Sequence, residues 1–279
     1  MTLPEYWVNG QRGGSLQVND RGFSYGDGAF ETLRVHRGRL HLLERHLARL
    51  ALACDALDIT FERARIEQQL QQVLDYLDEH SVEHAALRLA LSRGEGERGY
   101  SGSCGAPTIA ISVSPQQAWR EAAAPCDIII CETSLASQPA LAGLKHSNRL
   151  EQVLAAREVA AAGKGEGLML NQRGEAICCV AANIFVVFDD CVVTPPIGDC
   201  GVRGTVRELL LEQAASAGIA IREQLFSCAD LPQAQEMFLT NSLLGVRSVA
   251  RCGVQRFTST RWGDTLRSHF FEWCESSRT

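Results

Sequence analysis

The stretch LAGLKHSNRLEQV (141–153) places Lys145 directly before a change from loop-like to helical sequence. The apolar residues that follow recur with the helical period and predict a helix over 149–162. Asn148 is expected to cap this helix, and Glu151, three residues on, completes a pair that resembles a capping box. The pattern therefore predicts that Lys145 lies where a strand ends and a helix begins.

That position bears on the chemistry of the Lys145 amine. The partial positive charge at a helix N-terminus and burial both disfavour a second positive charge, so we expect the pKa of the amine to be lowered. A lowered pKa is what an imine-forming or general-base lysine requires. Because most lysines are exposed, a solvated loop lysine fits the same spacing, and the spacing alone leaves both interpretations open.

The composition and charge argue against two kinds of partner, nucleic acid and membrane. The chain has 279 residues, of which 46% are hydrophobic and 22% charged, with a net charge of −6. The sequence has no basic cluster typical of nucleic-acid binding and no apolar run of the length that crosses a membrane. The segment MTLPEYWVNG does not resemble a signal peptide, and the 11 cysteines are irregularly spaced without a C-x-x-C pair. We expect a cytoplasmic protein with reduced thiols that acts on a small molecule.

The order of apolar patterns indicates an α+β fold in two domains. We expect a smaller domain over 1–114, a linker over 115–124 and a larger domain with Lys145 over 125–279. The first half predicts strands and hairpins over 5–40, helices over 40–57 and 61–79, and strands over 85–93 and 107–113. The second half predicts the helix after Lys145, a helix over 205–217, and strands at CDIIICETS, GLMLN, AICC, NIFVVF and IAIREQLF.

A glycine motif, Gly94, Gly96 and Gly99, matches G-x-G-x-x-G after a predicted strand. A dinucleotide site needs a helix to follow, whereas YSGSCGAP and another strand follow here. Two glutamates inside the motif would also repel phosphate. We therefore interpret it as a hairpin loop.

A second motif, His80-Ser-Val-Glu-His84, spells the H-x-x-E-H pattern of some zinc peptidases. That chemistry needs both histidines on one helical face. The predicted helix ends before His80 and a strand begins at Ala85, so a zinc hydrolase is the weaker interpretation.

Two short segments could hold a phosphate. Gly204-Thr205-Val206 opens a predicted helix, whose first N–H groups can bind phosphate. Thr240-Asn241-Ser242 offers a hydroxyl-rich turn after an apolar run. A reactive lysine together with a phosphate site is what pyridoxal phosphate requires. Because Thr and Ser are also common helix caps, neither segment decides the matter.

Five longer runs carry a family pattern: RGFSYGDGAFETLRV (21–35), ERHLARL (44–50), KHSNRLEQ (145–152), AANIFVV (181–187) and FLTNSLLGVRSV (238–249). These runs resemble the fold-type IV pyridoxal-phosphate enzymes, and among them the bacterial aminodeoxychorismate lyases. The lyases typically show K-H-x-N-R-L-E-Q around their lysine and an R-G-Y-S loop, which stands here at 98–101. The resemblance spans nearly the whole chain.

The resemblance implies a role for each matching residue. Lys145 would form the imine with pyridoxal 5′-phosphate and act as general base, and Arg49 would contact the phosphate. The remainder of the phosphate site would be Thr205, Val206, Asn241 and Ser242. Arg98 and Tyr100 would bind a substrate carboxylate, for which an arginine fork is well suited, and Phe30 would face the substrate, where we expect it to pack rather than react.

One position departs from the family pattern. Relatives usually carry a glutamate five residues before the asparagine of the AAN run, where it keeps the pyridine nitrogen of the cofactor protonated. The corresponding residue here is Cys178. Glu175 is nearby, but at three residues along a strand it points to the opposite face. A thiol cannot hold a proton on that nitrogen as a carboxylate does.

The resemblance implies conversion of 4-amino-4-deoxychorismate to 4-aminobenzoate and pyruvate through an external aldimine, in a homodimer. Cys178 favours this lyase reaction over transamination, since the aromatic product supplies part of the driving force. The alternatives are a D-amino-acid or branched-chain aminotransferase of the same fold, and a non-catalytic cofactor-binding protein.

Overall fold

The computed structural model describes residues 5–101, 104–118 and 124–276. The chain divides into two units, one comprising Met1–Trp119 with Leu144–Asn148, the other Arg120–Gly143 with Arg149–Thr279. Each unit contains its own sheet and helices, which confirms the predicted α+β class. In the described residues no helix combines the length and apolar character needed to cross a membrane.

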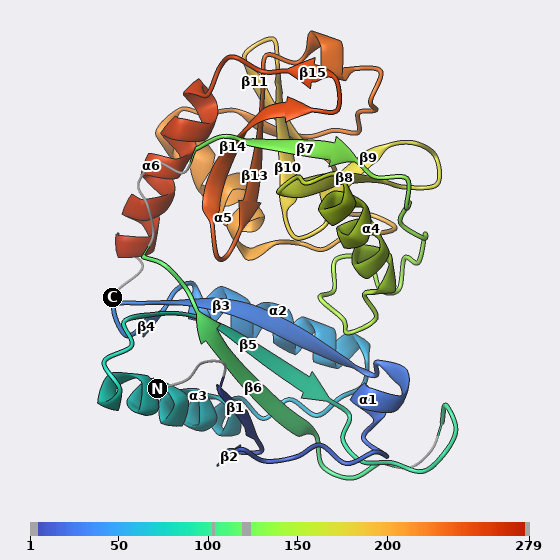
Figure 1. Cartoon of the computed structure of the whole chain (residues 1–279), viewed down its shortest axis with the longest axis vertical. Helices are drawn as coiled ribbons and strands as arrows, with labels where there is room; N and C mark the ends of the chain where they lie inside the picture. Colours follow the sequence, from blue (N-terminus) through green and yellow to red (C-terminus); the bar gives the residue numbers. More distant parts are fainter. Residues whose placement is uncertain (1–4, 102–103, 119–123, 277–279) are drawn as a thin grey trace. The chain divides into compact units, whose positions relative to one another are not determined.

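The first unit is built on a six-stranded antiparallel sheet with the strand order β2-β1-β6-β5-β3-β4 (Figure 1). The longest pair of strands is β3 and β5, and β5 and β6 form the predicted hairpin. The strands are β1 (Glu5–Val8), β2 (Gln11–Arg12), β3 (Gly28–His36), β4 (Arg39–Leu40), β5 (His84–Ser92) and β6 (Thr108–Pro115).

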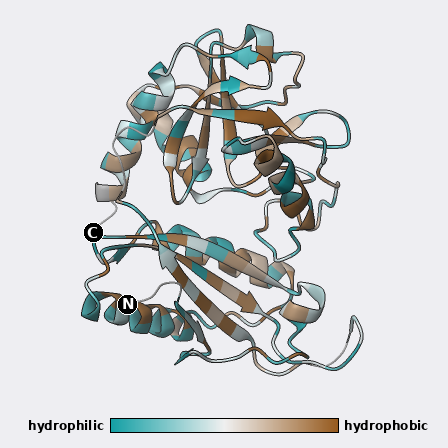
Figure 2. Cartoon of the chain, in the orientation of Figure 1, coloured by the Kyte–Doolittle hydropathy of each residue, from teal (hydrophilic) through white to brown (hydrophobic). Residues whose placement is uncertain are grey.

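Two helices, α2 (Leu43–Ala56) and α3 (Arg63–Glu79), share a core with one face of this sheet. In α3 the buried positions follow the helical period, and in the strands every second residue faces the helices. In Figure 2 the strands carry brown hydrophobic bands, whereas the surface of α3 is largely teal. The core includes Leu33, Val35, Leu47, Leu50, Ile66, Leu70, Val73, Leu77, Leu87, Leu89, Ile109 and Ile111.

A short helix, α1 (Arg21–Tyr25), lies where the sequence predicted only strands and hairpins. The Asp20 carboxylate caps it by accepting the N–H of Gly22 at 2.8 Å. Gly26 ends it in the left-handed conformation with φ +66°, which favours glycine. Five residues are too few to show an apolar period, so the sequence pattern did not reveal α1.

The edge of β3 is shared by two partners. β4 pairs only with Val35 and His36, at the end of the strand. At its beginning, the N–H of Phe30 donates to the carbonyl of Lys145 at 2.9 Å, and the N–H of Ser147 donates to that of Gly28 at 2.8 Å. These bonds place residues 144–148 in the first unit, whereas the sequence-based division put Lys145 in the second domain.

The second unit is built on a mixed nine-stranded sheet, with the order β12-β11-β10-β13-β14-β7-β8-β9 and β15 beside β14. β7 runs parallel to both β14 and β8, and β12 runs parallel to β11. The strands are β7 (Cys126–Ile130), β8 (Glu166–Leu170), β9 (Ala176–Cys179), β10 (Asn183–Phe188), β11 (Cys191–Thr194), β12 (Ile221–Glu223), β13 (Glu236–Asn241), β14 (Gly245–Cys252) and β15 (Gln255–Arg256).

The helices of the second unit are α4 (Leu150–Ala161), α5 (Thr205–Gln213) and α6 (Arg261–Ser276), with short 3₁₀ turns η1 (Ala214–Ala217) and η2 (Leu231–Gln233). α4 and the α5–η1 pair confirm the helices predicted over 149–162 and 205–217. The linker predicted over 115–124 falls partly on residues 119–123, which lie outside the described residues.

The predicted cap of α4 is wrong. The residue at the cap position is Arg149, and no side chain makes a capping hydrogen bond there. Asn148 instead donates its Nδ2 to the carbonyl of Gly26 at 3.0 Å, and Glu151 accepts the N–H of Ala136 at 2.9 Å. Both side chains are therefore used to fix loops rather than the helix terminus.

The close contact between β3 and β5 predicts a cost for any side chain at Gly28. A Cβ there would lie 2.5 Å from the carbonyl oxygen of Leu91, which is backbone and cannot move aside easily. We expect Gly28→Ala to lower the free energy of unfolding by about 1–3 kcal/mol, measured by urea denaturation. Gly165→Ala is the control, because a Cβ there meets nothing within 4 Å; equal midpoints for the two variants would contradict the prediction.

Candidate active site

Lys145 lies in the extended segment beside β3, and α4 begins at Leu150, five residues after it. Its side chain is half-buried, and the Nζ atom lies 4.4 Å from the centroid of the Phe30 ring. The backbone of this lysine is thus fixed by a strand rather than left in a solvated loop. The expected lowering of its pKa stays a prediction.

Phe30 lies outside the hydrophobic core of its unit. It is buried and lies on the face of β3 opposite the side chains that pack against α2 and α3. The guanidinium carbon of Arg88, on the neighbouring strand β5, lies 3.5 Å from its ring centroid. The ring therefore contacts two cationic side chains, those of Arg88 and Lys145.

Arg49, the candidate phosphate ligand, is paired with a buried carboxylate on β3. Its Nε donates to Glu31 at 2.8 Å and one terminal nitrogen donates at 2.5 Å, while Nδ1 of His46 lies 2.6 Å from the same carboxylate. Such a two-point pair fixes the plane and direction of the guanidinium. Arg49 is therefore an oriented group rather than a mobile surface charge.

The charges of this cluster set the pKa values of its members. Burial alone would raise the pKa of Glu31, but the charge and hydrogen bonds of Arg49, with the bond to His46, lower it to about 2. Burial lowers the pKa of His46, and the nearby positive charges of Arg49 and Lys145 lower it further against the opposing effect of Glu31. The cluster holds an ionised Glu31 beside a histidine that resists protonation.

Neither Glu31 nor His46 was predicted from the sequence to belong to the site. A signal was present, because Glu31 alternates with apolar residues that face the helices, so its carboxylate must be buried on that face. A buried carboxylate requires a cationic or hydrogen-bonding partner. The partner was not evident because it lies on the following helix rather than on a neighbouring strand.

In the second unit the start of α5 forms a tight backbone turn around Asn183. A Cβ at Gly204 would lie 1.9 Å from the Asn183 Oδ1, so only glycine fits at this cap position. The Asn183 Nδ2 donates to the carbonyl of Val202 at 2.9 Å. Thr205 and Val206 follow as the first buried residues of the helix, and their N–H groups belong to a helix N-terminus that suits an anion.

Thr240, at the end of β13, lies opposite Asn183 in the register of β10 and β13. Its hydroxyl is buried, and the structure gives it no hydrogen-bond partner. A buried hydroxyl normally has a hydrogen-bond partner. A phosphate bound near the α5 N-terminus could accept a hydrogen bond from the Thr240 hydroxyl. The residues present therefore fit a phosphate group in this unit.

Of the predicted residues that follow Thr240, Asn241 ends β13 and Ser242 lies in the turn between β13 and β14. The side chain of Asn241 is used within that turn. Its Nδ2 donates to the carbonyl of Ala181 at 3.1 Å, and its Oδ1 accepts the N–H groups of Leu243 and Leu244 at 3.1 and 2.8 Å. Its part in binding a ligand would therefore be to shape the turn.

Cys178 is buried in β9, opposite Met169 of β8. Burial, and secondarily the neighbouring Cys200, raise the pKa of its thiol to about 12, so the group is neutral. Glu175 does not replace the missing carboxylate, since Asn171 and Arg173 donate to it at 2.7 and 2.9 Å.

A further acidic residue, Glu166, was not identified from the sequence. Its carboxyl group accepts the N–H of Gly167 at 3.0 Å and that of Ala181, in the AAN run, at 3.2 Å. Burial raises its pKa against the lowering effect of these bonds. Glu166 therefore holds the backbone of the AAN run in place.

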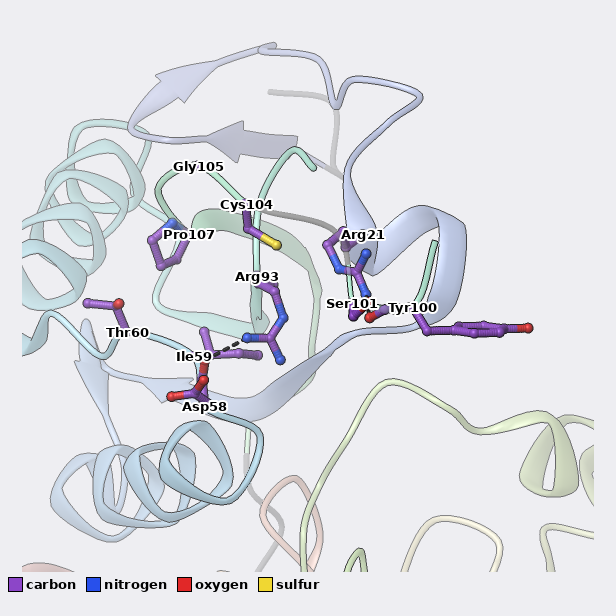
Figure 3. A pocket seen from close by; sticks show the side chains of 10 residues that line it. All are labelled: Arg21, Asp58, Ile59, Thr60, Arg93, Tyr100, Ser101, Cys104, Gly105 and Pro107. Carbon is purple, nitrogen blue, oxygen red and sulfur yellow. Dashed lines mark hydrogen bonds between the residues drawn. The ribbon is translucent and has the colours of Figure 1, made fainter. Parts of the chain in front are cut away.

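Arg98 and Tyr100 lie on the loop between β5 and β6, and both side chains are exposed. Figure 3 shows the Tyr100 side chain pointing away from a polar pocket of about 450 Å³ that Arg21 and Arg93 line in the first unit. The two candidate substrate ligands are therefore exposed to solvent. The backbone of their loop is held by hydrogen bonds from Arg21.

The zinc interpretation is not supported. His80 follows α3 as its C-cap residue and His84 begins β5, so the two histidines do not share a helical face. Within the residues that the structure describes, no cluster of three or more His, Cys, Asp or Glu side chains is placed to hold a metal ion. The glycine motif is the predicted hairpin loop between β5 and β6.

Residues 28–252 match the family model described as amino-transferase class IV. The chain belongs to the class IV aminotransferase family. Members of this family resemble it over nearly its full length, and the two-sheet α+β architecture is that of the fold-type IV pyridoxal-phosphate enzymes.

The chain is 36% identical over 252 residues to an aminodeoxychorismate lyase from Vibrio harveyi, covering 88% of this chain and 90% of that protein. The crystal structure of a 4-amino-4-deoxychorismate lyase from Pseudomonas aeruginosa superimposes with a TM-score of 0.85 at 38% identity, covering 96% and 98% of the two chains. A putative branched-chain-amino-acid aminotransferase from Methanocaldococcus jannaschii is 28% identical over 233 residues, 83% of this chain and 81% of that protein.

The pKa of Glu31 predicts an acid-sensitive fold for this class IV protein. Because the folded-state pKa is depressed from 4.5 to about 2, the stabilisation is complete above pH ~5 and is lost as the pH falls toward 2. The difference corresponds to ~3 kcal/mol. We expect the free energy of unfolding to fall by this order between pH 5 and pH 2, and Glu31→Gln to reduce that slope. Parallel pH profiles for the two proteins would contradict the assignment.

Proposed function

We propose that this protein is an aminodeoxychorismate lyase that converts 4-amino-4-deoxychorismate to 4-aminobenzoate and pyruvate with pyridoxal 5′-phosphate. The placement of Lys145 on the edge of β3, within a KHSNRLEQ run, is the observation that carries the proposal. Near-full-length identities of 36% and 38% to two lyases support it. The more distant likeness to an aminotransferase supports the family rather than this reaction.

Each unit, taken by itself, offers groups that suit the proposed cofactor. The α5 N-terminus at Thr205 and Val206 and the orphaned Thr240 hydroxyl suit its phosphate, and Arg49, already oriented by Glu31, would supply a cationic contact. Pyridoxal 5′-phosphate, when bound, supplies an aldehyde that condenses with amines and a ring that withdraws electrons from the adjacent carbon.

Under this proposal Lys145 would hold the cofactor before substrate arrives and would move a proton during turnover. Its amine would take the proton from C4 of the substrate ring. The enolpyruvyl group leaves from C3 with the electron pair of its C–O bond and becomes pyruvate on protonation, so the ring becomes aromatic. Arg98 would bind a substrate carboxylate through its guanidinium.

Cys178 supports elimination rather than transamination. Its buried, neutral thiol supplies no negative charge to keep the pyridine nitrogen protonated. We propose that the electron sink is weakened and that the reaction tolerates this, because formation of the aromatic ring provides part of the driving force.

We also propose a cytoplasmic homodimer, as the family resemblance implies. The molar mass from light scattering would test the dimer: about twice the 30.5 kDa of the chain is expected.

Reductive trapping tests the assignment of Lys145. Borohydride treatment of the protein with its cofactor should leave a pyridoxyl group on Lys145, found by peptide mapping, with loss of the visible absorption band. Lys145→Ala should lose the trapped group and lower 4-aminobenzoate formation by about a thousandfold or more. Lys164→Ala, a change at another half-exposed lysine of the chain, is the control. A tag at a different residue, or no tag, would overturn the proposal.

The reaction itself is tested against the nearest rival. Wild-type protein should form 4-aminobenzoate from 4-amino-4-deoxychorismate, and should form little pyruvate from D-alanine with 2-oxoglutarate. Efficient pyruvate formation in the second assay, without 4-aminobenzoate in the first, would identify an aminotransferase.

A carboxylate at position 178 should shift the balance between the two reactions. We expect Cys178→Glu to raise the rate of transamination relative to elimination by about tenfold or more, because a protonated ring nitrogen stabilises the carbanion that transamination needs. Cys178→Ser is the matched control, since it adds no charge. The hypothesis is wrong if the ratio of the two rates in Cys178→Glu equals that in Cys178→Ser.

A further inference from the structure

The segment from Asp20 to Phe30 contacts both candidate functional segments of the first unit. One end of it binds the loop that carries Arg98 and Tyr100, and the other binds the backbone of Lys145. α1 lies within this segment. The family resemblance implies no role in the reaction for α1, although α1 contacts the loop that carries Arg98 and Tyr100.

Arg21, the first residue of α1, is buried and distributes its guanidinium among three acceptors. Nε donates to Asp27 at 2.8 Å, and the two terminal nitrogens donate to the carbonyls of Gly99 and Tyr100 at 2.7 Å each. Arginine, with its planar fork, can donate in three directions at once, whereas lysine carries a single nitrogen. The two carbonyls belong to consecutive peptide units, Gly99–Tyr100 and Tyr100–Ser101, so Arg21 fixes the backbone that follows Arg98.

Tyr25, the last residue of α1, holds the same part of the loop from a second side. Its hydroxyl accepts the N–H of Gly99 at 3.0 Å, and its ring lies 5.6 Å from the ring of Tyr100. Gly99 has a φ of +113° and no atom near the position that a Cβ would take. The loop therefore owes its conformation here to α1 rather than to packing of its own side chains.

The other end of the segment fixes the lysine. The carbonyls of Gly26 and Gly28 accept from Asn148 Nδ2 at 3.0 Å and from the N–H of Ser147 at 2.8 Å, and the N–H of Phe30 donates to Lys145. A Cβ at Gly26 would lie 2.5 Å from the Asn148 side-chain oxygen, so the two segments are in close contact. The same eleven residues thus set the positions of the lysine backbone and of the loop.

Arg93 provides a natural comparison for Arg21. It shares the Asp27 carboxylate, with Nε at 2.8 Å, but its terminal nitrogens donate to the carbonyls of Leu57 and Asp58, just after α2. Figure 3 shows Arg93 directed toward Asp58, while Arg21 lies beside Ser101. The two arginines therefore make similar use of Asp27 and differ in the backbone that they hold.

We propose that Arg21 is a positioning residue that sets the loop bearing Arg98 and Tyr100 for substrate binding, through the carbonyls of Gly99 and Tyr100. The role in substrate binding rests on the proposed function. The restraint of the loop by Arg21, which we call the clamp, does not. Arg21 acts through the loop and makes no contact with the reacting atoms.

Trypsin provides a test that does not depend on activity, because Arg98 is exposed and its peptide bond to Gly99 directly precedes the two peptide units that Arg21 holds. In Arg21→Lys we expect native-state cleavage after Arg98, followed by mass spectrometry, to be about tenfold faster than in the wild type, since each charge-assisted bond lost is worth more than a tenfold change. Arg93→Lys, the matched control, should change that rate less than about twofold.

Kinetics of the cofactor-loaded protein test the link to substrate. Arg21→Lys should raise KM for 4-amino-4-deoxychorismate about tenfold with kcat changed less than about threefold, and should leave borohydride trapping at Lys145 unchanged. A merely structural role would lower the amount of active protein without changing KM.

Each result decides the proposal. If the rate of cleavage at Arg98 is unchanged in Arg21→Lys, Arg21 does not restrain the loop, whatever reaction the protein catalyses. If cleavage is faster but KM is unchanged, Arg21 does not position the loop for substrate binding. If the wild type forms no 4-aminobenzoate, the proposed function fails while the tryptic rate still decides the clamp. Should Arg21→Lys not fold, Tyr25→Phe, which removes only the acceptor for Gly99, should accelerate the same cleavage about threefold.

Discussion

The pairing of residues 145–147 with the first residues of β3 is the constraint on which the chemistry of the first unit depends. It exists because β4 is only two residues long and leaves the beginning of the β3 edge open. An open strand edge presents unpaired N–H and C=O groups, and here the lysine segment supplies their partners. The position of the Lys145 backbone therefore follows from the sheet. The close approach also explains why glycines stand at 26 and 28, where a Cβ would meet Asn148 or the backbone of β5.

Three buried or partly buried arginines of the same unit are paired with carboxylates. Arg49 binds Glu31, while Arg21 and Arg93 share Asp27. Burial raises the pKa of Asp27, but the bonds and charges of the two arginines lower it overall, as Arg49 does for Glu31. Because an unpaired buried charge is costly, each arginine is held in one direction. Such pairs contribute orientation more than net stability, and orientation is what a phosphate contact or a loop support requires.

The parts of the fold that could be predicted from the sequence are those fixed by local patterns. α3 and the β5–β6 hairpin follow directly from apolar periodicity, and the KHSNRLEQ run located Lys145. The capping interpretation of Asn148 failed because a cap is a local signal, whereas the acceptor that Asn148 uses, the Gly26 carbonyl, lies 122 residues away in the sequence. Glu31 and its partner on α2 were missed for the same reason. α1 was missed because helices of one turn have no period to detect.

The surroundings of Cys178 show why a carboxylate is not simply exchangeable with a thiol in the second unit. Cys178 shares its apolar cluster with Cys131 and Cys200, and burial raises the pKa of all three thiols, to about 12, 11 and 12. In such surroundings an ionised carboxylate would be stable only while a cationic partner, such as a protonated ring nitrogen, lies against it. The ionised glutamate of relatives and the protonated ring nitrogen would thus stabilise each other. With a neutral thiol in place of the glutamate, nothing at this position favours protonation of the ring nitrogen. Under the proposed function, a chain that has given up this pair must draw more of its driving force from the substrate, and an elimination that ends in an aromatic ring is a reaction that supplies it.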